Sequence, residues 1–353
     1  LYRQSTAAVD HVDIENTLDS FTVKTTGTNA WTIEGLEQFT MRDDFLEAVI
    51  TNAAAPKASE RVGDDITDLS QYGLDTPSGK ATAYFTDGTS QTFEIGGQVP
   101  GENKYYVRLA GENTVYVISN SYMTYFLKAQ TDFVSAQITP TSESGITIQD
   151  ATFSGTCRPA PIVLGRATDE EVEADPTLKY NVYRVTSPHE GGVDFDRGGK
   201  FIQYVNGMMG EGVAAIKPTA EDMAQYGLDN PYSIVEYSTI DGQSVKLSFG
   251  KTDAGEAEGI RYVYREGVPL IYTVNASDVA WAEVTEQEMI SPLYFSPGID
   301  DIAEIHVVSG GQDYAFVLAE GDDDGMNITC NGEKVDTENF RKLLNLMISL
   351  PAE

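Results

Sequence analysis

The sequence predicts an α+β protein made of tandem β-meander units, mainly antiparallel, each with one or two packed helices. The segment Gln71–Pro77 (Gln-Tyr-Gly-Leu-Asp-Thr-Pro) returns 154 positions later as Gln225–Pro231. A long internal repeat is typical of a chain built from copies of one structural unit. An Asp-Gly pair, a strong signal for a hairpin turn, follows each copy. Short connections between the strand-like stretches make neighbouring strands antiparallel.

The repeat spacing divides the 353 residues into two units and part of a third. We expect the first unit over residues 1–145, the second over residues 146–299 and a C-terminal half unit over residues 300–353. The half unit reads as a hairpin, a further strand and a helix, and the chain reaches Glu353 where a third copy of the motif is due. A hydrophobic content of 41% is sufficient for each unit to bury a core.

Alternating and helical apolar patterns place the individual elements. In the first unit, Thr40 is expected to cap a helix over residues 42–50. The remaining elements of that unit are expected as strands at 21–24, 31–33, 80–86, 90–96, 104–110 and 114–119, and a helix at 122–128. In the second unit we expect strands starting near 146 and 162 and at 180–185, 233–240, 243–249, 260–266 and 269–274, and helices at 200–209 and 277–289. In the half unit we expect strands at 305–308, 314–318 and 326–329.

The repeated motif has a mechanical explanation as a helix end. In the second copy, Thr219 begins a short helix, Gly227 follows its end in a left-handed conformation, and Leu228 then contacts Met223. A proline two residues after the Asp prevents the helix from continuing. We favour this structural role over a ligand-binding loop for the Tyr-Gly-Leu-Asp motif, which comprises Tyr72, Gly73, Leu74, Asp75 and Pro77 in the first copy and Tyr226, Gly227, Leu228, Asp229 and Pro231 in the second.

Tyrosines are frequent in the predicted meanders. In the strand at 260–266, Tyr262 and Tyr264 project to one face of the sheet and the two arginines to the other. Tyr105 lies on the counterpart strand of the first unit. Tyrosines exposed beside arginine would form a platform for sugar rings, so these three residues are the candidate ligand platform. The alternative is that they pack against a helix with their hydroxyls reaching solvent.

Charge and cysteine content exclude several classes of function. The formal net charge of −32 argues against nucleic acid and anionic lipid surfaces as partners, because both need lysine and arginine. The acidic residues are scattered, and the run Asp322–Gly325 favours a tight turn over a calcium loop. Cys157 and Cys330 form neither a disulfide framework nor a zinc pattern, and we expect them to be unpaired.

Catalytic patterns are sparse. The histidines His11, His189 and His306 lie in unrelated contexts, and no nucleophile elbow or phosphate-binding glycine loop is present. We therefore expect no enzyme activity, no catalytic residue, no metal site and no cofactor. A pair of distant carboxylates of the kind that hydrolases use leaves no local signature, so that alternative stays open.

Several of these residues together resemble a bacterial family, the domain of unknown function 4340. The resemblance rests on Trp31 in an early strand, the helix at 42–50, the Tyr-Gly-Leu-Asp-x-Pro string, the Asp-Gly hairpin and the paired strands around Tyr105 and Tyr116. It covers both units, with the segment 146–190 departing from the pattern. The resemblance implies an envelope protein with an N-terminal membrane anchor, associated in some members with transport systems of the gliding-motility type.

The sequence accordingly predicts an extracytoplasmic, non-enzymatic interaction or scaffold module that binds an unknown protein in the cell envelope. It contains no apolar run of 18 residues. Because it begins at Leu1 rather than methionine, we expect a fragment or processed form whose anchor lies outside this chain. A glycan-binding module using the candidate ligand platform is the second hypothesis, and a hydrolase with a carboxylate pair is the third.

Overall fold

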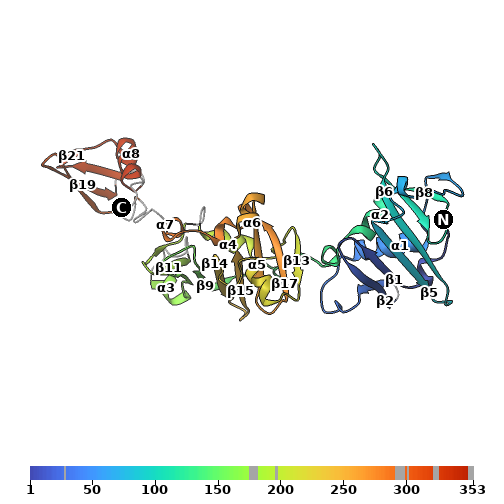
Figure 1. Ribbon diagram of the computed structural model, residues 1–353. Helices are drawn as coiled ribbons and strands as arrows, with labels where there is room; N and C mark the ends of the chain where they lie inside the picture. The colour runs from blue at the N-terminus through green and yellow to red at the C-terminus, as the bar shows by residue number, and fades with distance from the viewer. Residues whose placement is uncertain are drawn as a thin grey trace. The chain divides into compact units, whose positions relative to one another are not determined.

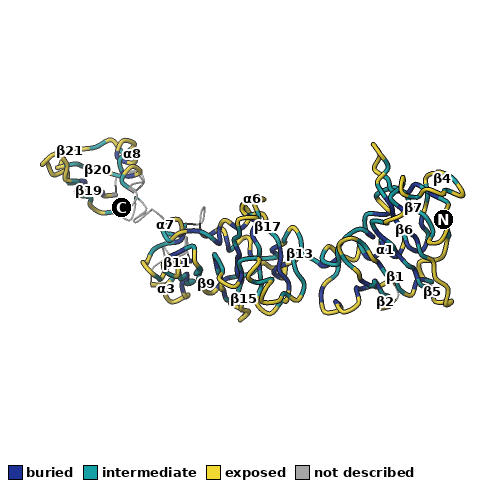
Figure 2. Tube along the Cα trace, viewed as in Figure 1, coloured by how far each residue is buried: buried dark blue, intermediate teal, exposed yellow. Residues whose placement is uncertain are grey.

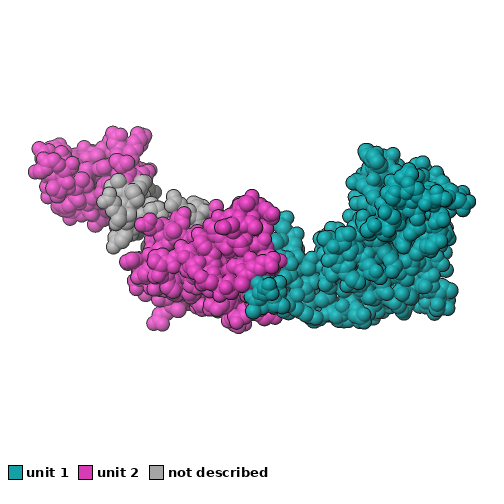
Figure 3. Space-filling view, in the orientation of Figure 1, with its two compact units in different colours: residues 1–138, 209–222, 268–274 teal, residues 139–208, 223–267, 275–353 magenta. Residues whose placement is uncertain are grey.

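The computed structural model describes most of the chain: residues 1–27, 29–174, 182–194, 198–290, 299, 302–320 and 326–348. Contacts group the residues into two compact units (Figure 3). The first comprises Leu1–Ile138, Met209–Asp222 and Val268–Val274, and the second comprises Thr139–Met208, Met223–Gly267 and Asn275–Glu353. The strands form three separate sheets, of eight, nine and four strands (Figure 1).

The first sheet is an antiparallel meander extended at both ends, with the strand order β3-β2-β1-β5-β6-β7-β8-β4. Its strands are β1 (Val9–Asn16), β2 (Ser20–Gly27), β3 (Ala30–Ile33), β4 (Glu60–Gly63), β5 (Gly79–Phe85), β6 (Ser90–Gln98), β7 (Lys104–Leu109) and β8 (Val115–Ser119). Its helical segments are η1 (Thr6–Ala8), α1 (Asp43–Ala54), η2 (Ser70–Tyr72), α2 (Asn120–Met123), η3 (Thr124–Leu127) and η4 (Gln130–Phe133). The helix expected at 122–128 is therefore a short α-helix continued by a 3₁₀ helix.

The core of this sheet lies on the face covered by α1 and η3, which contact β1 and β5. Val12 and Ile14 of β1 point into it with Leu46 and Ile50 of α1, and all four are fully buried. Figure 2 shows the buried parts of the chain in dark blue. The expected cap at Thr40 is wrong: α1 begins after Arg42, which makes no side-chain capping bond. Two acidic residues in the first turn of α1 face the positive end of the helix dipole instead.

The second sheet has the strand order β12-β11-β10-β9-β14-β15-β16-β17-β13. Its strands are β9 (Ile148–Ser154), β10 (Ile162–Arg166), β11 (Tyr183–Ser187), β12 (Gly191–Gly192), β13 (Gly212–Ile216), β14 (Ser233–Thr239), β15 (Ser244–Gly250), β16 (Ile260–Arg265) and β17 (Leu270–Asn275). The helical segments are α3 (Asp169–Ala174), η6 (Gly198–Lys200), α4 (Phe201–Tyr204), α5 (Ala220–Gln225), α6 (Asp253–Glu258), η7 (Ala276–Ala282) and α7 (Glu286–Met289). The start of the strand expected at 180–185 lies outside the described residues.

The two large sheets share one topology. With β9, β10, β11, β14, β15, β16, β17 and β13 matched in that order to β1, β2, β3, β5, β6, β7, β8 and β4, the strand orders are identical, and β12 is an addition at one edge. The register agrees as well, since Ala83 lies opposite Val12 while Tyr237 lies opposite Ala151. The prediction of an α+β fold built from repeated, mainly antiparallel units is confirmed.

The third sheet repeats only the opening of this pattern. It contains β18 (Glu304–Ser309), β19 (Gln312–Glu320), β20 (Met326–Cys330) and β21 (Glu333–Lys334), in sequential order, followed by α8 (Thr337–Ile348). Phe316, Leu318 and Ile328 pack on Phe340 and Leu344 of α8 to form its core. The acidic run Asp322–Gly325 lies outside the described residues. Cys157 and Cys330 are both free thiols.

Candidate binding site

The Tyr-Gly-Leu-Asp motif forms the same turn in both large sheets. Gly73 and Gly227 have φ values of 64° and 67°, the left-handed conformation that the capping interpretation requires. The Leu228 amide donates a hydrogen bond to the Met223 carbonyl at 2.7 Å, and the matching bond in the first copy is 3.1 Å. The two leucines that follow the glycines are buried. The turn therefore closes a short helix and places one leucine in the core.

The backbone of each turn lies in close contact with a glycine of the same repeat, Gly96 on β6 or Gly250 on β15. A Cβ atom added to Gly96 would lie 2.3 Å from the Tyr72 carbonyl oxygen, and one added to Gly250 would lie 2.0 Å from that of Tyr226. Real Cβ atoms do not approach backbone oxygen this closely, so both positions require glycine. We call the motif together with its glycine the clasp, because it joins the segment before β5 to β6 in the first repeat and the segment before β14 to β15 in the second.

The candidate platform tyrosines lie on β7 and β16. Tyr262 is half-buried and its ring packs on that of Tyr226, with centroids 4.6 Å apart. Burial raises the pKa of Tyr262. Its counterpart in the first sheet is Tyr106, which contacts Tyr72 at 4.9 Å. Tyr105 and Tyr264 are half-buried as well. The sequence did not single out Tyr106 as a candidate. Matching the two repeats position by position would have done so, because Tyr106 corresponds to Tyr262.

Two buried arginines, Arg261 and Arg158, form a hydrogen-bond network in the second repeat. Arg261 is 5% exposed and donates hydrogen bonds to Glu256 and Glu283. Arg158, 9% exposed, donates to the carbonyl oxygens of Ala282 and Ser154 at 2.7 and 2.6 Å. These bonds tie η7 to β9 and β16, which covers the core on that side. We assign the network to folding rather than to chemistry.

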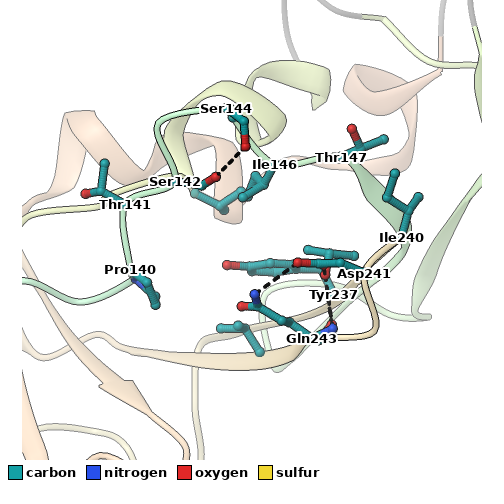
Figure 4. A pocket seen from close by; sticks show the side chains of 14 residues that line it. Pro140, Thr141, Ser142, Ser144, Ile146, Thr147, Tyr237, Ile240, Asp241 and Gln243 are labelled. Carbon is teal, nitrogen blue, oxygen red and sulfur yellow. Dashed lines mark hydrogen bonds between the residues drawn. The ribbon is translucent and has the colours of Figure 1, made fainter.

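A pocket of about 320 Å³ opens in the second compact unit (Figure 4). It lies between the loop that precedes β9 and the hairpin that joins β14 to β15. Its lining combines apolar and uncharged polar residues with one carboxylate: Pro140, Thr141, Ser142, Ser144, Gly145, Ile146, Thr147, Val205, Tyr237, Thr239, Ile240, Asp241, Gln243 and Val245. None of these residues was predicted from the sequence to bind a ligand.

The polar groups on the hairpin side of the pocket are held in place by one another. The Asp241 carboxylate accepts hydrogen bonds from the Thr239 hydroxyl and, at 3.1 Å, from the Gln243 amide group. Its pKa is lowered, chiefly by the bond from Thr239. Tyr237 is 4% exposed, and its burial raises its pKa to about 12. Among the described residues, its hydroxyl has no hydrogen-bond partner.

Each of the three histidines contacts a carboxylate. His11 pairs with Asp10 and stacks on Tyr84, and His189 pairs with Glu286. The His306 Nε2 atom forms a 2.8 Å hydrogen bond with the Glu304 carboxylate, and its Nδ1 atom lies 3.4 Å from the Asp313 carboxylate. Within the described ranges, no group of three or more His, Cys, Asp or Glu side chains could hold a metal ion. No helix in the described part of the chain is long and apolar enough to cross a membrane.

A comparison with family models finds a match over most of the chain. The model described as "Domain of unknown function (DUF4340)" matches residues 31–180 and again residues 184–351. The chain belongs to the DUF4340 family. Comparisons with curated proteins and with solved structures find no match.

The two DUF4340 matches are out of phase with the sheets. The first begins in β3 and runs through β10, and the second begins in β11 and runs through β20 and α8. The first DUF4340 match therefore covers the later part of the first sheet and the opening hairpin of the second, and the second match covers the later part of the second sheet together with all four strands of the third sheet and α8. The hairpin β18–β19 of the third sheet is thus an integral part of the second DUF4340 copy.

Proposed function

We propose that this DUF4340 protein is a non-enzymatic, extracytoplasmic interaction module of the cell envelope that binds a protein partner at β18. The observation that carries the proposal is the place of β18 in its sheet. Its counterparts β1 and β9 each pair on both sides, β1 with β2 and β5, and β9 with β10 and β14. Among the residues that the structure describes, β18 pairs with β19 and stands at the edge of its sheet.

The free side of β18 presents a regular set of backbone groups. The Leu318 amide donates to the Ala303 carbonyl, which fixes the register of the hairpin. Because alternate residues of an antiparallel strand face opposite neighbours, the backbone groups of Glu304, His306 and Val308 point away from β19. An exposed row of this kind accepts an added strand from a partner.

The two complete sheets define the chemistry of the strand that fits. β5 and β14 both alternate buried with half-exposed or exposed residues, and the buried residues of β5 are small or apolar, namely Gly79, Ala81, Ala83 and Phe85. On the other face, Lys80 of β5 forms a salt bridge with Glu15 of β1. The same face of the third sheet carries Glu304 and Asp313. We therefore commit to a partner segment with alternating apolar residues and a basic residue on its outer face.

The experiment uses a peptide as a surrogate partner. A synthetic peptide with the sequence of Gly79–Phe85, extended by two residues at each end, is titrated into the protein while amide hydrogen exchange of β18 is followed. We expect slower exchange at the outward amides of β18, and weaker protection with a peptide in which Lys80 is replaced by glutamate. Unchanged exchange at those amides would contradict the proposal.

Substitutions at Val308 provide the matched pair. Its side chain is 74% exposed, so it contributes little to the core. Val308→Pro removes an outward N–H without removing a bond to β19, whereas Val308→Thr keeps the N–H. Loss of peptide protection in the proline variant alone supports strand addition, and equal binding by both variants rules it out.

The envelope location is the part of the proposal that the family resemblance supports. The resemblance implies a membrane anchor and, in its finer form, association with a transport system. Fractionation of cells that carry the full-length protein, followed by protease treatment of intact spheroplasts, tests the location. We expect digestion from outside the membrane; a protected cytosolic protein would contradict the proposal.

A further inference from the structure

In the first repeat, aromatic side chains fill the region that corresponds to the pocket of the second repeat. In both repeats the segment before the first strand hydrogen-bonds to the end of the long hairpin: the Thr86 amide donates to Ala8, and the Ile240 amide donates to Thr147. This match aligns Tyr2 with Thr141. The motif spacing aligns Phe85 with Thr239.

The first repeat uses these two aromatic residues to close the space. The Tyr2 ring packs edge-on against Phe85 with centroids 6.3 Å apart, and its hydroxyl donates to the Ala53 carbonyl at 2.6 Å. Two threonines stand at these positions in the second repeat, where the pocket opens. The pocket is therefore a specific departure from the shared fold rather than a consequence of it.

Tyr237 brings a hydroxyl without a partner among the described residues to the lining of the pocket. The first repeat has Ala83 at this position, so the tyrosine is particular to the second. The residue is 4% exposed, and no described residue accepts or donates a hydrogen bond at its hydroxyl. The hydroxyl is not among the completely enclosed atoms that lack a partner. It is therefore not fully enclosed, and Tyr237 lines the pocket, where a ligand could satisfy the hydroxyl.

The lining selects for a neutral ligand that carries several hydroxyl groups. No lysine or arginine lines the pocket, so an anion finds no counter-charge. Both oxygens of the one carboxylate, Asp241, already accept hydrogen bonds from neighbouring side chains. The hydroxyls of Ser142 and Ser144, 3.1 Å apart, lie across the pocket from the Tyr237 ring (Figure 4). Pro140 and Ile146 supply apolar contact.

We infer that this pocket binds a single sugar ring. A sugar ring combines hydroxyl groups at its rim with apolar C–H faces, which matches polar groups set between apolar walls. The volume of about 320 Å³ lies at the lower end of the range for small-molecule sites and fits one ring rather than a chain. This site is separate from the candidate ligand platform on β7 and β16 and from the edge of β18.

The binding test uses monosaccharides as probes. D-glucose, D-galactose and N-acetyl-D-glucosamine are titrated separately into the protein, and binding is followed by saturation-transfer NMR and by the amide shifts of residues 140–147 and 237–245. Ethylammonium and acetate serve as charged comparisons. We expect at least one sugar to shift both segments in a saturable way. Absence of a sugar response, or a stronger response to either ion, overturns the inference.

A pair of tyrosine-to-phenylalanine variants separates binding from folding. Tyr237→Phe removes a hydroxyl that has no protein partner, so we expect an unchanged or higher melting temperature and about tenfold weaker sugar binding. Tyr183→Phe removes a buried hydroxyl that donates to the Ile148 carbonyl at 3.1 Å. We expect it to melt earlier and to bind sugar normally. Loss of stability without loss of binding in Tyr237→Phe would overturn the assignment.

Discussion

The first and second repeats use one backbone plan and differ where side chains fill it. The clasp is the same in both, down to a glycine beneath the tyrosine carbonyl at Gly96 and Gly250. The segment before the first strand is not: Tyr2 and Phe85 pack together in one repeat, and threonines line a pocket in the other. Positions that set backbone geometry are thus retained, whereas positions that only fill space are free to acquire binding chemistry.

The strongest test of the shared plan is to disrupt the clasp in each repeat. Gly96→Ala and Gly250→Ala would each force a Cβ into a backbone carbonyl, and we expect a loss of about 3 kcal/mol of unfolding free energy in each case. Gly242→Ala is the control, because nothing lies within 4 Å of its Cβ position, although Gly242, unlike Gly96 and Gly250, has a positive φ. It should lose only about 1 kcal/mol. Chemical denaturation monitored by tryptophan fluorescence measures all three.

A smaller loss of stability is expected at a position where the second repeat has a buried arginine and the first repeat has a tyrosine. Arg261 of the second repeat bonds to Glu256 and Glu283, whereas the matching residue of the first repeat is Tyr105. Arg261→Met removes the cation paired with Glu283 and leaves Glu256 paired with Lys251, and we expect a loss of about 2 kcal/mol. Tyr105→Met should cost less than half of that. Equal losses in denaturant melts would show that the ion network adds nothing to packing.

The start of the motif helix offers a weaker contrast. The Thr219 hydroxyl accepts from the Asp222 amide and donates to the Asp222 carboxylate, forming a reciprocal cap. In the first repeat, Asp68 accepts from the Ser70 amide instead. We expect Thr219→Ala to lower stability by about 1 kcal/mol and Thr219→Ser to restore most of it. Failure of serine to restore stability would mean that the methyl group, not the cap, matters.

These comparisons also show why some elements could be predicted and others could not. β5, β6 and their counterparts have clean alternation and an Asp-Gly turn, so the sequence located them within one or two residues. β1 escaped detection because its register shifts between Val9 and His11, which breaks the alternation of apolar residues. β4 has no buried residue, so it carries no pattern at all. Its counterpart β13 was missed as well.

The candidate site was hidden for a different reason. The pocket depends on residues that are far apart in the chain, such as Thr141 and Thr239, and a threonine carries no signal for an absent aromatic ring. Only the alignment of the two repeats reveals what those positions replace. The tyrosines of the candidate ligand platform could be identified from the sequence. Tyr262 was proposed there as an exposed residue, whereas in the structure its ring packs against that of Tyr226.

The smallest effect that we predict is a pH dependence of stability that is confined to the third sheet. Its outer face holds His306 beside Glu304 and Asp313, and the hydrogen bond with Glu304 is the main cause that raises the pKa of His306 above 6.5. The protonated imidazole therefore favours the folded sheet. This contribution is fully present below pH 6.5 and is lost as the pH rises through the folded-state pKa.

We expect hydrogen exchange in β18 and β19 to quicken slightly over that pH range, after correction for the intrinsic rate, while the two large sheets stay unchanged. His306→Gln should remove the pH dependence, since glutamine keeps a polar side chain but cannot titrate. NMR titration of the imidazole gives its pKa directly. A value at or below 6.5 would show that the two carboxylates do not stabilise the charged form, and the predicted difference between the sheets would then have no cause.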